Sequence, residues 1–157
     1  MLALKRHVAY LKYVTRHKWY VWQEGRKLGV PIYLLLLHDM SKLNPREYCA
    51  YARTFYGRDG RHRYVENVEF AYAWNHHQKC NKHHWQYWVL RWDRGESTPL
   101  EMPDKYRREM LADWRSASRC LSGSDTVSEW YNKNYINLIL HPATRQWIEE
   151  QLGDNNG

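Results

Sequence analysis

The spacing of apolar side chains most constrains the fold, because they recur every three or four residues and form no alternating, strand-like run. One helical seam in residues 4–28 carries His7, Leu11, Val14, His17, Val21 and Leu28. Gly29 and Pro31 are typical helix-stop residues. Further helices are predicted over 31–42, 45–55, 65–77, 83–92, 103–120, 127–133, 135–140 and 142–152. The sequence therefore predicts one all-α domain over residues 1–157, a compact bundle of about six to eight helices.

Aromatic side chains must supply much of the core, since aliphatic residues are sparse while Trp and Tyr number 9 and 13. Each buried ring removes roughly 150–250 Å² from water, so disorder is excluded. The longest apolar stretch, residues 30–37, is far below the roughly 20 needed to span a bilayer. No signal peptide is recognisable, and three cysteines without a C-x-x-C pair indicate reduced thiols. We expect a cytoplasmic protein without a membrane partner.

The formal net charge of +7 and the pI near 9.3 favour an anionic partner. The basic residues are scattered, which favours a solvated surface first, a nucleotide-phosphate pocket second and a nucleic-acid groove third.

His38 and Asp39 end an almost wholly apolar helix. Both are costly to bury unless they are paired or bound to metal. An imidazole nitrogen beside a carboxylate oxygen suits a transition metal of intermediate hardness. The alternative is a local role at the helix C-terminus.

His17 shares the apolar seam with Val14 and Val21, so it is expected to face the interior. His7 lies on the same seam and is the competing candidate. A satisfied core histidine is the alternative interpretation for either residue.

Asp113 lies within an apolar stripe of the predicted helix 103–120. That stripe contains Tyr106, Met110, Ala117 and Cys120. Asp is rarely buried without a partner, so Asp113 is a further candidate ligand. The alternative is a salt bridge to Arg107 or Arg115.

A histidine-rich segment places His76, His77, His83 and His84 with Cys80 within nine residues. We expect His76, His83 and His84 to line the pocket, as ligands of a second metal or as a clamp for substrate phosphate. Which of the four histidines bind metal stays open. The alternatives are a structural zinc with Cys80 and a solvated loop whose imidazoles stack on Trp and Tyr.

The order His17, His38-Asp39, Asp113 resembles the HD-domain superfamily, helical metal-dependent phosphohydrolases that hold a divalent metal with two His and two Asp. Residues 38–42 resemble the H-D-x-G-K form of several branches, with Ser41 in place of Gly. The resemblance implies that Lys42 lies near the substrate phosphate. It also implies an HD-like helical bundle.

A closer resemblance covers nearly the whole chain, to short phage and bacterial proteins that are HD-like and of undefined function. It is carried by HKWYV at 17–21, HDMSKLNPREY at 38–48, AWNHHQKCNKHHWQYWVL at 73–90, MPDKYRREMLADW at 102–114 and LHPATR at 140–145.

The resemblance implies hydrolysis of a nucleotide or another phosphorylated small molecule by metal-activated water. The metal would be Mn, Co, Mg, Fe or Zn, one or two ions per chain, held by His17, His38, Asp39 and Asp113. Lys42 and the clustered histidines would neutralise phosphate charge. Glu47 is a candidate to hydrogen-bond a ligating histidine, although a helix capping box also explains it.

Two other functions stay open. One is a basic domain that binds nucleic acid or protein, and the other is an HD-fold nucleotide sensor with weak catalysis. The sequence leaves the substrate and the oligomeric state undecided.

Overall fold

The computed structural model describes residues 2–153 and is all-α, as predicted, with seven α-helices in that range. The α-helices are α1 (Leu2–Lys27), α2 (Ile32–Leu37), α3 (Pro45–Phe55), α4 (Val68–Cys80), α5 (Asp104–Ser122), α6 (Val127–Asn134) and α7 (Pro142–Gly153). Short 3₁₀ helices are η1 (Met40–Leu43), η2 (Trp85–Trp88) and η3 (Tyr135–Asn137).

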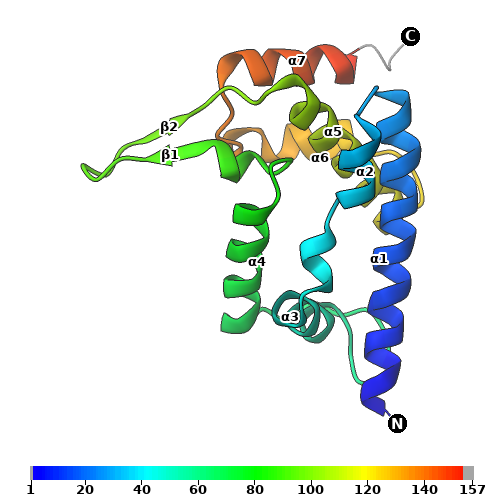
Figure 1. Cartoon of the computed structure of the whole chain (residues 1–157). Coiled ribbons are helices and arrows are strands. Elements are labelled where there is room, and N and C mark those ends of the chain that lie inside the picture. The colour runs from blue at the N-terminus through cyan, green and yellow to red at the C-terminus, as the bar shows by residue number, and fades with distance from the viewer. Residues whose placement is uncertain (1, 154–157) are drawn as a thin grey trace.

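The long helix α1 forms one side of the molecule and packs along α5 (Figure 1). Helices α3 and α4 pack against each other, and α3 also contacts α1. The segment with α2 and η1 runs between α1 and α4 (Figure 1). Helix α7 lies across the end of the molecule that is opposite to α3 (Figure 1). The elements α1, η1, α4 and α5 therefore border the middle of the bundle.

The predicted helix over 83–92 is wrong. Its second half forms strand β1 (Val89–Arg91), which pairs antiparallel with β2 (Ser97–Pro99). Residues 95–99, predicted as a linker, hold Gly95 at φ 95° and the second strand. The hairpin projects from the bundle (Figure 1). Strands of three residues are too short for an alternating pattern to reveal them.

The helix predicted over 31–42 is also wrong as a single element, because α2 ends at Leu37 and η1 begins at Met40. The helix predicted over 65–77 lies three residues later, as α4. Its start is set by Asn67, whose Oδ1 accepts a hydrogen bond from the Phe70 N–H at 2.8 Å. Only residues 135–137 of the predicted helix 135–140 are helical, as η3.

Two buried clusters of different composition fill the bundle. Around α5, α6 and α7 the cluster is mainly aliphatic: Met102, Met110, Leu111, Val127, Tyr131, Leu138, Leu140, Ile148 and Leu152. Around α1, α3 and α4 it is largely aromatic, with Tyr10, Val14, Ala50, Tyr51, Ala52 and Ala73 at its centre and six further rings packed against it.

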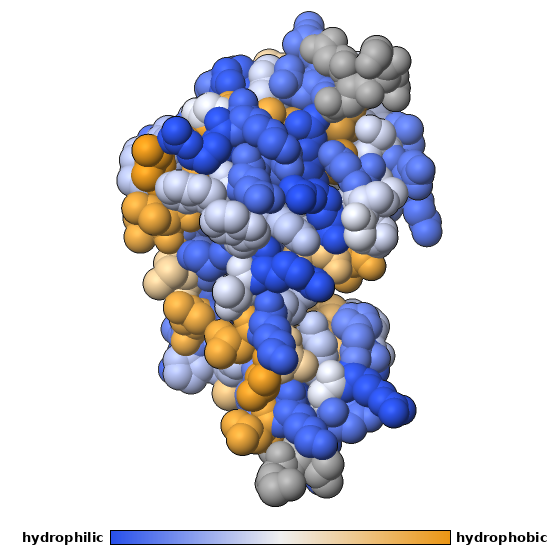
Figure 2. Space-filling view, turned by 90° about the vertical axis from the view of Figure 1, so that its right-hand side faces the viewer, coloured by the Kyte–Doolittle hydropathy of each residue, from blue (hydrophilic) through white to orange (hydrophobic). Residues whose placement is uncertain are grey.

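Hydrophilic side chains cover most of the face seen in Figure 2, and the apolar ones form separate patches. Within the described part of the chain, no helix combines the length and apolar character needed to cross a bilayer.

Candidate metal centre

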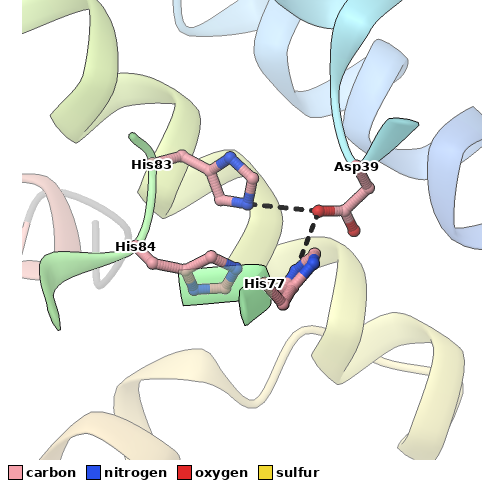
Figure 3. Close-up of side chains that lie close together, drawn as sticks. All are labelled: Asp39, His77, His83 and His84. Atoms are coloured by element: carbon pink, nitrogen blue, oxygen red, sulfur yellow. Dashed lines mark ion pairs between the residues drawn. The ribbon is translucent and has the colours of Figure 1, made fainter. Parts of the chain in front are cut away.

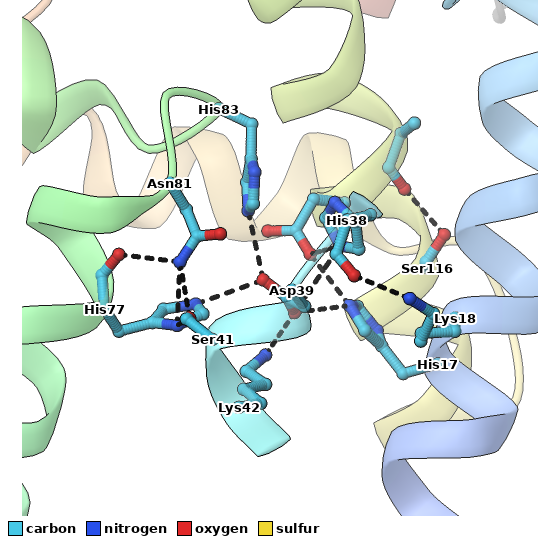
Figure 4. A network of polar contacts seen from close by, with 12 residues as sticks. His17, Lys18, His38, Asp39, Ser41, Lys42, His77, Asn81, His83 and Ser116 are labelled. Carbon is cyan, nitrogen blue, oxygen red and sulfur yellow. Dashed lines mark hydrogen bonds and ion pairs between the residues drawn. The ribbon is translucent and has the colours of Figure 1, made fainter. Parts of the chain in front are cut away.

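Imidazole and carboxylate groups from four parts of the chain meet in the middle of the bundle (Figure 4). Helix α1 supplies His17, the junction of α2 and η1 supplies His38 and Asp39, and α5 supplies Asp113. Helix α4 and the loop after it supply His77, His83 and His84. All seven side chains are buried.

The interruption after α2 aims both His38 and Asp39 inward. Asp39 has φ 57°, the only positive φ of a non-glycine residue within 2–153, and Asp is among the few residues that tolerate this conformation. In a continuous helix the two side chains would point about 100° apart. Lys18 Nζ donates to the carbonyl oxygens of Leu36 and His38 at 3.2 and 2.8 Å, so carbonyls near the interruption keep hydrogen bonds.

The first donor group contains the four residues that the sequence analysis assigned to metal, His17, His38, Asp39 and Asp113. His17 Nε2 lies 2.9 Å from Asp113 Oδ1 and 3.7 Å from Asp39 Oδ2. His38 Nε2 lies 3.4 Å from Asp39 Oδ2 and 3.5 Å from Asp113 Oδ1. One ligand atom from each residue lies within 4.8 Å of all the others.

A second donor group consists of Asp39, His77, His83 and His84 (Figure 3). Asp39 Oδ1 lies 3.2 Å from His77 Nε2 and 3.4 Å from His83 Nε2. Asp39 belongs to both groups, with Oδ2 toward the first and Oδ1 toward the second. A carboxylate shared in this way is suited to bridge two ions.

Buried carboxylates orient two of these imidazoles from behind. His38 Nδ1 lies 3.0 Å from Glu109 Oε1, and His77 Nδ1 lies 2.9 Å from Glu47 Oε2. Because carboxylates accept, each Nδ1 donates its proton and the Nε2 lone pair is left to face the centre. This carboxylate–imidazole arrangement is typical of metal-ligating histidines.

The buried donor atoms are better placed to bind a cation than to hydrogen-bond one another. The Nε2 atoms of His17, His38, His77, His83 and His84 and Asp39 Oδ1 are buried and make no hydrogen bond of acceptable geometry, although carboxylate oxygens lie 2.9–3.4 Å from His17, His77 and His83. Such atoms are costly unless a ligand contacts them. Neutral imidazole nitrogen with carboxylate oxygen is a normal ligand set for transition metals. The two groups could therefore hold metal.

Local charges keep the acids of the centre ionised. Burial opposes ionisation of Asp39, but the nearby His38 and Lys42 hold its pKa well below the usual range. Burial likewise opposes ionisation of Asp113, and its contacts with His17 and His38 hold that pKa well below the usual range. Asp39 and Asp113 are therefore ionised and can act as anionic ligands.

The basic groups respond to the same charges. Burial disfavours the imidazolium form of His83, yet Asp39 and Glu109 raise its pKa to about 10. Burial and the charge of His83 lower the pKa of His84 well below the usual range, so its imidazole is neutral. Lys42 Nζ donates to Asp39 Oδ2, which raises the lysine pKa despite burial.

Ser41, which stands where the resembling motif has Gly, supports the second group. Its Oγ donates to Glu47 Oε2 at 3.0 Å, and Asn81 Nδ2 donates to Ser41 Oγ at 2.8 Å. Both hydrogen bonds lie beside the imidazole of His77. Glu47 therefore contacts a candidate ligand, as the sequence analysis proposed.

Two expectations about individual histidines need a correction or a choice. His76 lies outside both donor groups, because its half-exposed ring contacts Glu47 Oε1, so His77 occupies the place expected for His76. Neighbouring residues of a helix face different sides, which explains the exchange. His7 stacks on Tyr48 with ring centroids 5.7 Å apart and lies outside both groups, which leaves His17 as the candidate from α1.

Two alternative interpretations also find no support. Asp113 pairs with neither arginine that was considered, because Arg107 pairs with Asp104 and Arg115 with Asp125. Cys80 is exposed and belongs to no potential metal-binding group within the described residues.

A cavity of about 330 Å³ opens beside the centre and reaches His17, His84, Asp113 and Lys42. Of the three histidines expected to line the pocket, His84 lies on the cavity wall, whereas His76 and His83 do not. Its walls are aromatic, and they include Tyr10, Tyr13, Tyr51, Phe55, Tyr56, Phe70 and Trp74. Aromatic side chains therefore form the wall of this cavity as well as part of the core.

Sequence reasoning missed Glu109. It precedes Asp113 by four residues and therefore lies on the same face of α5, a spacing that marks it as a neighbour of the centre.

Comparison with known proteins gives one result for the whole chain: the model of a family of unknown function matches residues 6–154. Neither the curated proteins nor the solved structures contain a match.

Proposed function

The chain belongs to this family of unknown function, DUF5662, and we propose that it is a metal-dependent phosphohydrolase that acts on a nucleotide or nucleotide-like phosphate ester. The observation that carries the proposal is the convergence of five imidazole Nε2 atoms without hydrogen-bond partners on one buried aspartate. The resemblance to HD-domain proteins, through His17, His38-Asp39 and Asp113, supports the same chemistry.

Two divalent ions would fit the two donor groups, which share Asp39. His17, His38 and Asp113 would complete one site, and His77, His83 and His84 the other. The ligand set suits Mn²⁺, Co²⁺, Fe²⁺ or Zn²⁺ better than Mg²⁺, because imidazoles outnumber carboxylates. When bound, the ions would acidify water and stabilise charge on the phosphoryl oxygens.

In the hydrolysis, a bond forms between phosphorus and the water oxygen while the bond from phosphorus to the ester oxygen breaks. The proton released by water goes to the leaving oxygen. Lys42 faces both Asp39 and the cavity, so its ammonium group is placed to bind a phosphate oxygen of the substrate. The aromatic walls exclude water from the rest of the bound molecule.

The test combines metal analysis with a hydrolysis screen. Protein stripped by chelation and reloaded should bind one or two equivalents of divalent metal and release phosphate from members of a nucleotide panel. Asp39→Asn should abolish both properties, since Asn tolerates the left-handed backbone but lacks the bridging charge. The matched control is Asp104→Asn, an acid of α5 that pairs with Arg107 and Arg108 at the surface.

Reloaded wild-type protein that holds no metal would refute the site. Bound metal without hydrolysis of any phosphate ester would refute the enzyme and leave a metal-binding protein.

A further inference from the structure

The cavity beside the centre has room for a small organic group. Its volume of about 330 Å³ lies at the small end of the range for ligand sites, roughly 300–1,000 Å³. The candidate ligands and Lys42 lie at one part of its surface, and aromatic rings form most of the remainder. A phosphate ester bound at the metal would therefore place its organic group among these rings.

Two buried hydroxyl groups of residues in the cavity wall would favour an organic group with polar edges. The Oη atoms of Tyr10 and Tyr51 are buried without a hydrogen-bond partner, and both residues line the cavity. Burial raises the pKa of both hydroxyls, so they remain available as donors. A purely apolar ligand would leave both hydroxyls without a hydrogen-bond partner, which is unfavourable. A heteroaromatic base supplies both stacking surface and acceptor atoms.

The positive charge of Lys42 argues against a cationic ligand. Its Nζ lies 6.0 Å from the centroid of the Tyr51 ring, within the cavity lining. Aromatic walls without such a charge would suit a quaternary ammonium group. The ring set beside Lys42 instead favours a neutral aromatic group attached to an anion.

A basic loop adjoins the cavity. His62 lines both the cavity and a neighbouring cleft that is formed by residues 57–63, including Arg58, Arg61 and Arg63. Asp59 accepts a hydrogen bond from the Arg61 backbone N–H and lies 3.7 Å from Arg61 Nε. Arg58 and Arg63 have no acidic partner among the residues that the structure describes.

The loop is fixed against α1. Gly60 has φ +83°, and a Cβ there would lie 3.1 Å from the Lys5 carbonyl oxygen, so only glycine suits this approach. The Arg63 N–H donates to the Phe55 carbonyl at 2.9 Å. This arrangement holds the loop arginines near Arg6, whose pKa is lowered by burial and by their like charge. Cations held close to one another favour binding of an anion.

We propose that the substrate is a nucleoside that carries phosphate on both sides of its sugar. The scissile phosphate would bind at the metal centre, the base would stack within the aromatic cavity, and the second phosphate would bind Arg58 and Arg63. This inference rests on the proposed phosphohydrolase function. A free nucleoside 3′,5′-bisphosphate and the terminal nucleotide of a single-stranded oligonucleotide share this chemistry.

The experiment compares four substrates with metal-loaded protein: a nucleoside 3′,5′-bisphosphate, the 5′-mononucleotide, a 5′-phosphorylated single-stranded oligonucleotide and p-nitrophenyl phosphate. We expect the bisphosphate or the oligonucleotide to have a lower KM than the mononucleotide. The preference between these two identifies the source of the second phosphate.

The double variant Arg58→Gln/Arg63→Gln should raise KM for the doubly phosphorylated substrates by about 10- to 100-fold, the loss of a charge-assisted hydrogen bond. Its kcat and its KM for the mononucleotide should not change. The control Arg91→Gln/Arg94→Gln removes the same charge from the β1–β2 hairpin and should leave every KM unchanged. Tyr51→Phe should raise KM for nucleotides and leave that for p-nitrophenyl phosphate unchanged.

Equal KM values for mononucleotide and bisphosphate, unaffected by the loop substitutions, would overturn the inference while phosphohydrolysis stands. Absence of hydrolysis of all four compounds would overturn the proposed function, and this inference with it.

Discussion

The two buried regions of the bundle differ in whether their buried polar atoms have hydrogen-bond partners. Around α5, α6 and α7, aliphatic side chains fill the interior and buried hydroxyls are paired. Thr144 Oγ1 accepts from the Met102 N–H at 3.1 Å, and Tyr131 Oη donates to Glu149 Oε1 at 2.9 Å. Around the candidate metal centre, five imidazoles and two tyrosine hydroxyls are buried with unpaired polar atoms.

Helix α5 belongs to both regions. Met110 and Leu111 enter the aliphatic cluster, while Glu109 and Asp113 face the histidines. A rigid helix thus connects a region that stabilises the fold with a region that costs stability until a ligand binds. This difference predicts that folding stability and ligand binding respond to separate sets of substitutions.

The largest effect on folding is expected from Ile148→Ala in α7. Ile148 is fully buried, so truncation loses transfer free energy and leaves a cavity. The free energy of unfolding of the metal-free protein, measured in urea, should fall by about 2–5 kcal/mol. Metal affinity of the folded protein should not change.

The control is Ile136→Ala, whose side chain is 88% exposed and should cost less than about 0.5 kcal/mol. The separation of the two regions would be contradicted if Ile148→Ala weakened metal binding tenfold at a temperature where the variant is folded.

A smaller effect, in the opposite region, is expected from Glu109→Gln. The amide still accepts a hydrogen bond from His38 Nδ1 but loses the charge that makes this imidazole a better ligand. Metal affinity should fall by about 10- to 100-fold, measured by competition with a chelator. The urea midpoint of the metal-free protein should fall less than that of Ile148→Ala.

Glu149→Gln is the matched control, since Glu149 accepts a hydrogen bond from Tyr131 Oη in the aliphatic region. Unchanged metal affinity in Glu109→Gln, or an equal loss in both variants, would contradict the assignment of Glu109 to the centre.

The same division explains what the sequence could predict. Helices with long apolar seams, such as α1 and α5, are visible from spacing alone, and inward-facing His17 and Asp113 follow from their places on those seams. The hairpin escaped because strands of three exposed or half-buried residues carry no periodic signal. His77 could not be separated from His76, because that choice depends on how α4 is rotated about its axis. The rotation is set by tertiary contacts with α3 and η1.

The interruption of the helix at Asp39 was not predicted, for a different reason. Residues 31–37 have a helical, apolar pattern, and no Gly or Pro follows to end it. The helix ends because His38 and Asp39 face buried partners in α1, α4 and α5, and Asp tolerates the left-handed conformation this requires. That information lies in contacts distant in sequence.

The smallest of these effects is expected from Asn67→Ala at the start of α4, the helix that carries His77. The substitution removes the cap on the Phe70 N–H and should lower the free energy of unfolding by about 1 kcal/mol. Asn67→Asp should recover most of this loss, because a carboxylate caps equally well although it lacks the amide that donates to Thr54 Oγ1. Both variants should bind metal as the wild type does, because the cap is at the opposite end of α4 from His77. A loss of metal affinity in Asn67→Ala that Asn67→Asp restores would show instead that α4 is too weakly held to keep His77 in place, and the region around the centre would then depend on local helix stability as well as on its ligand.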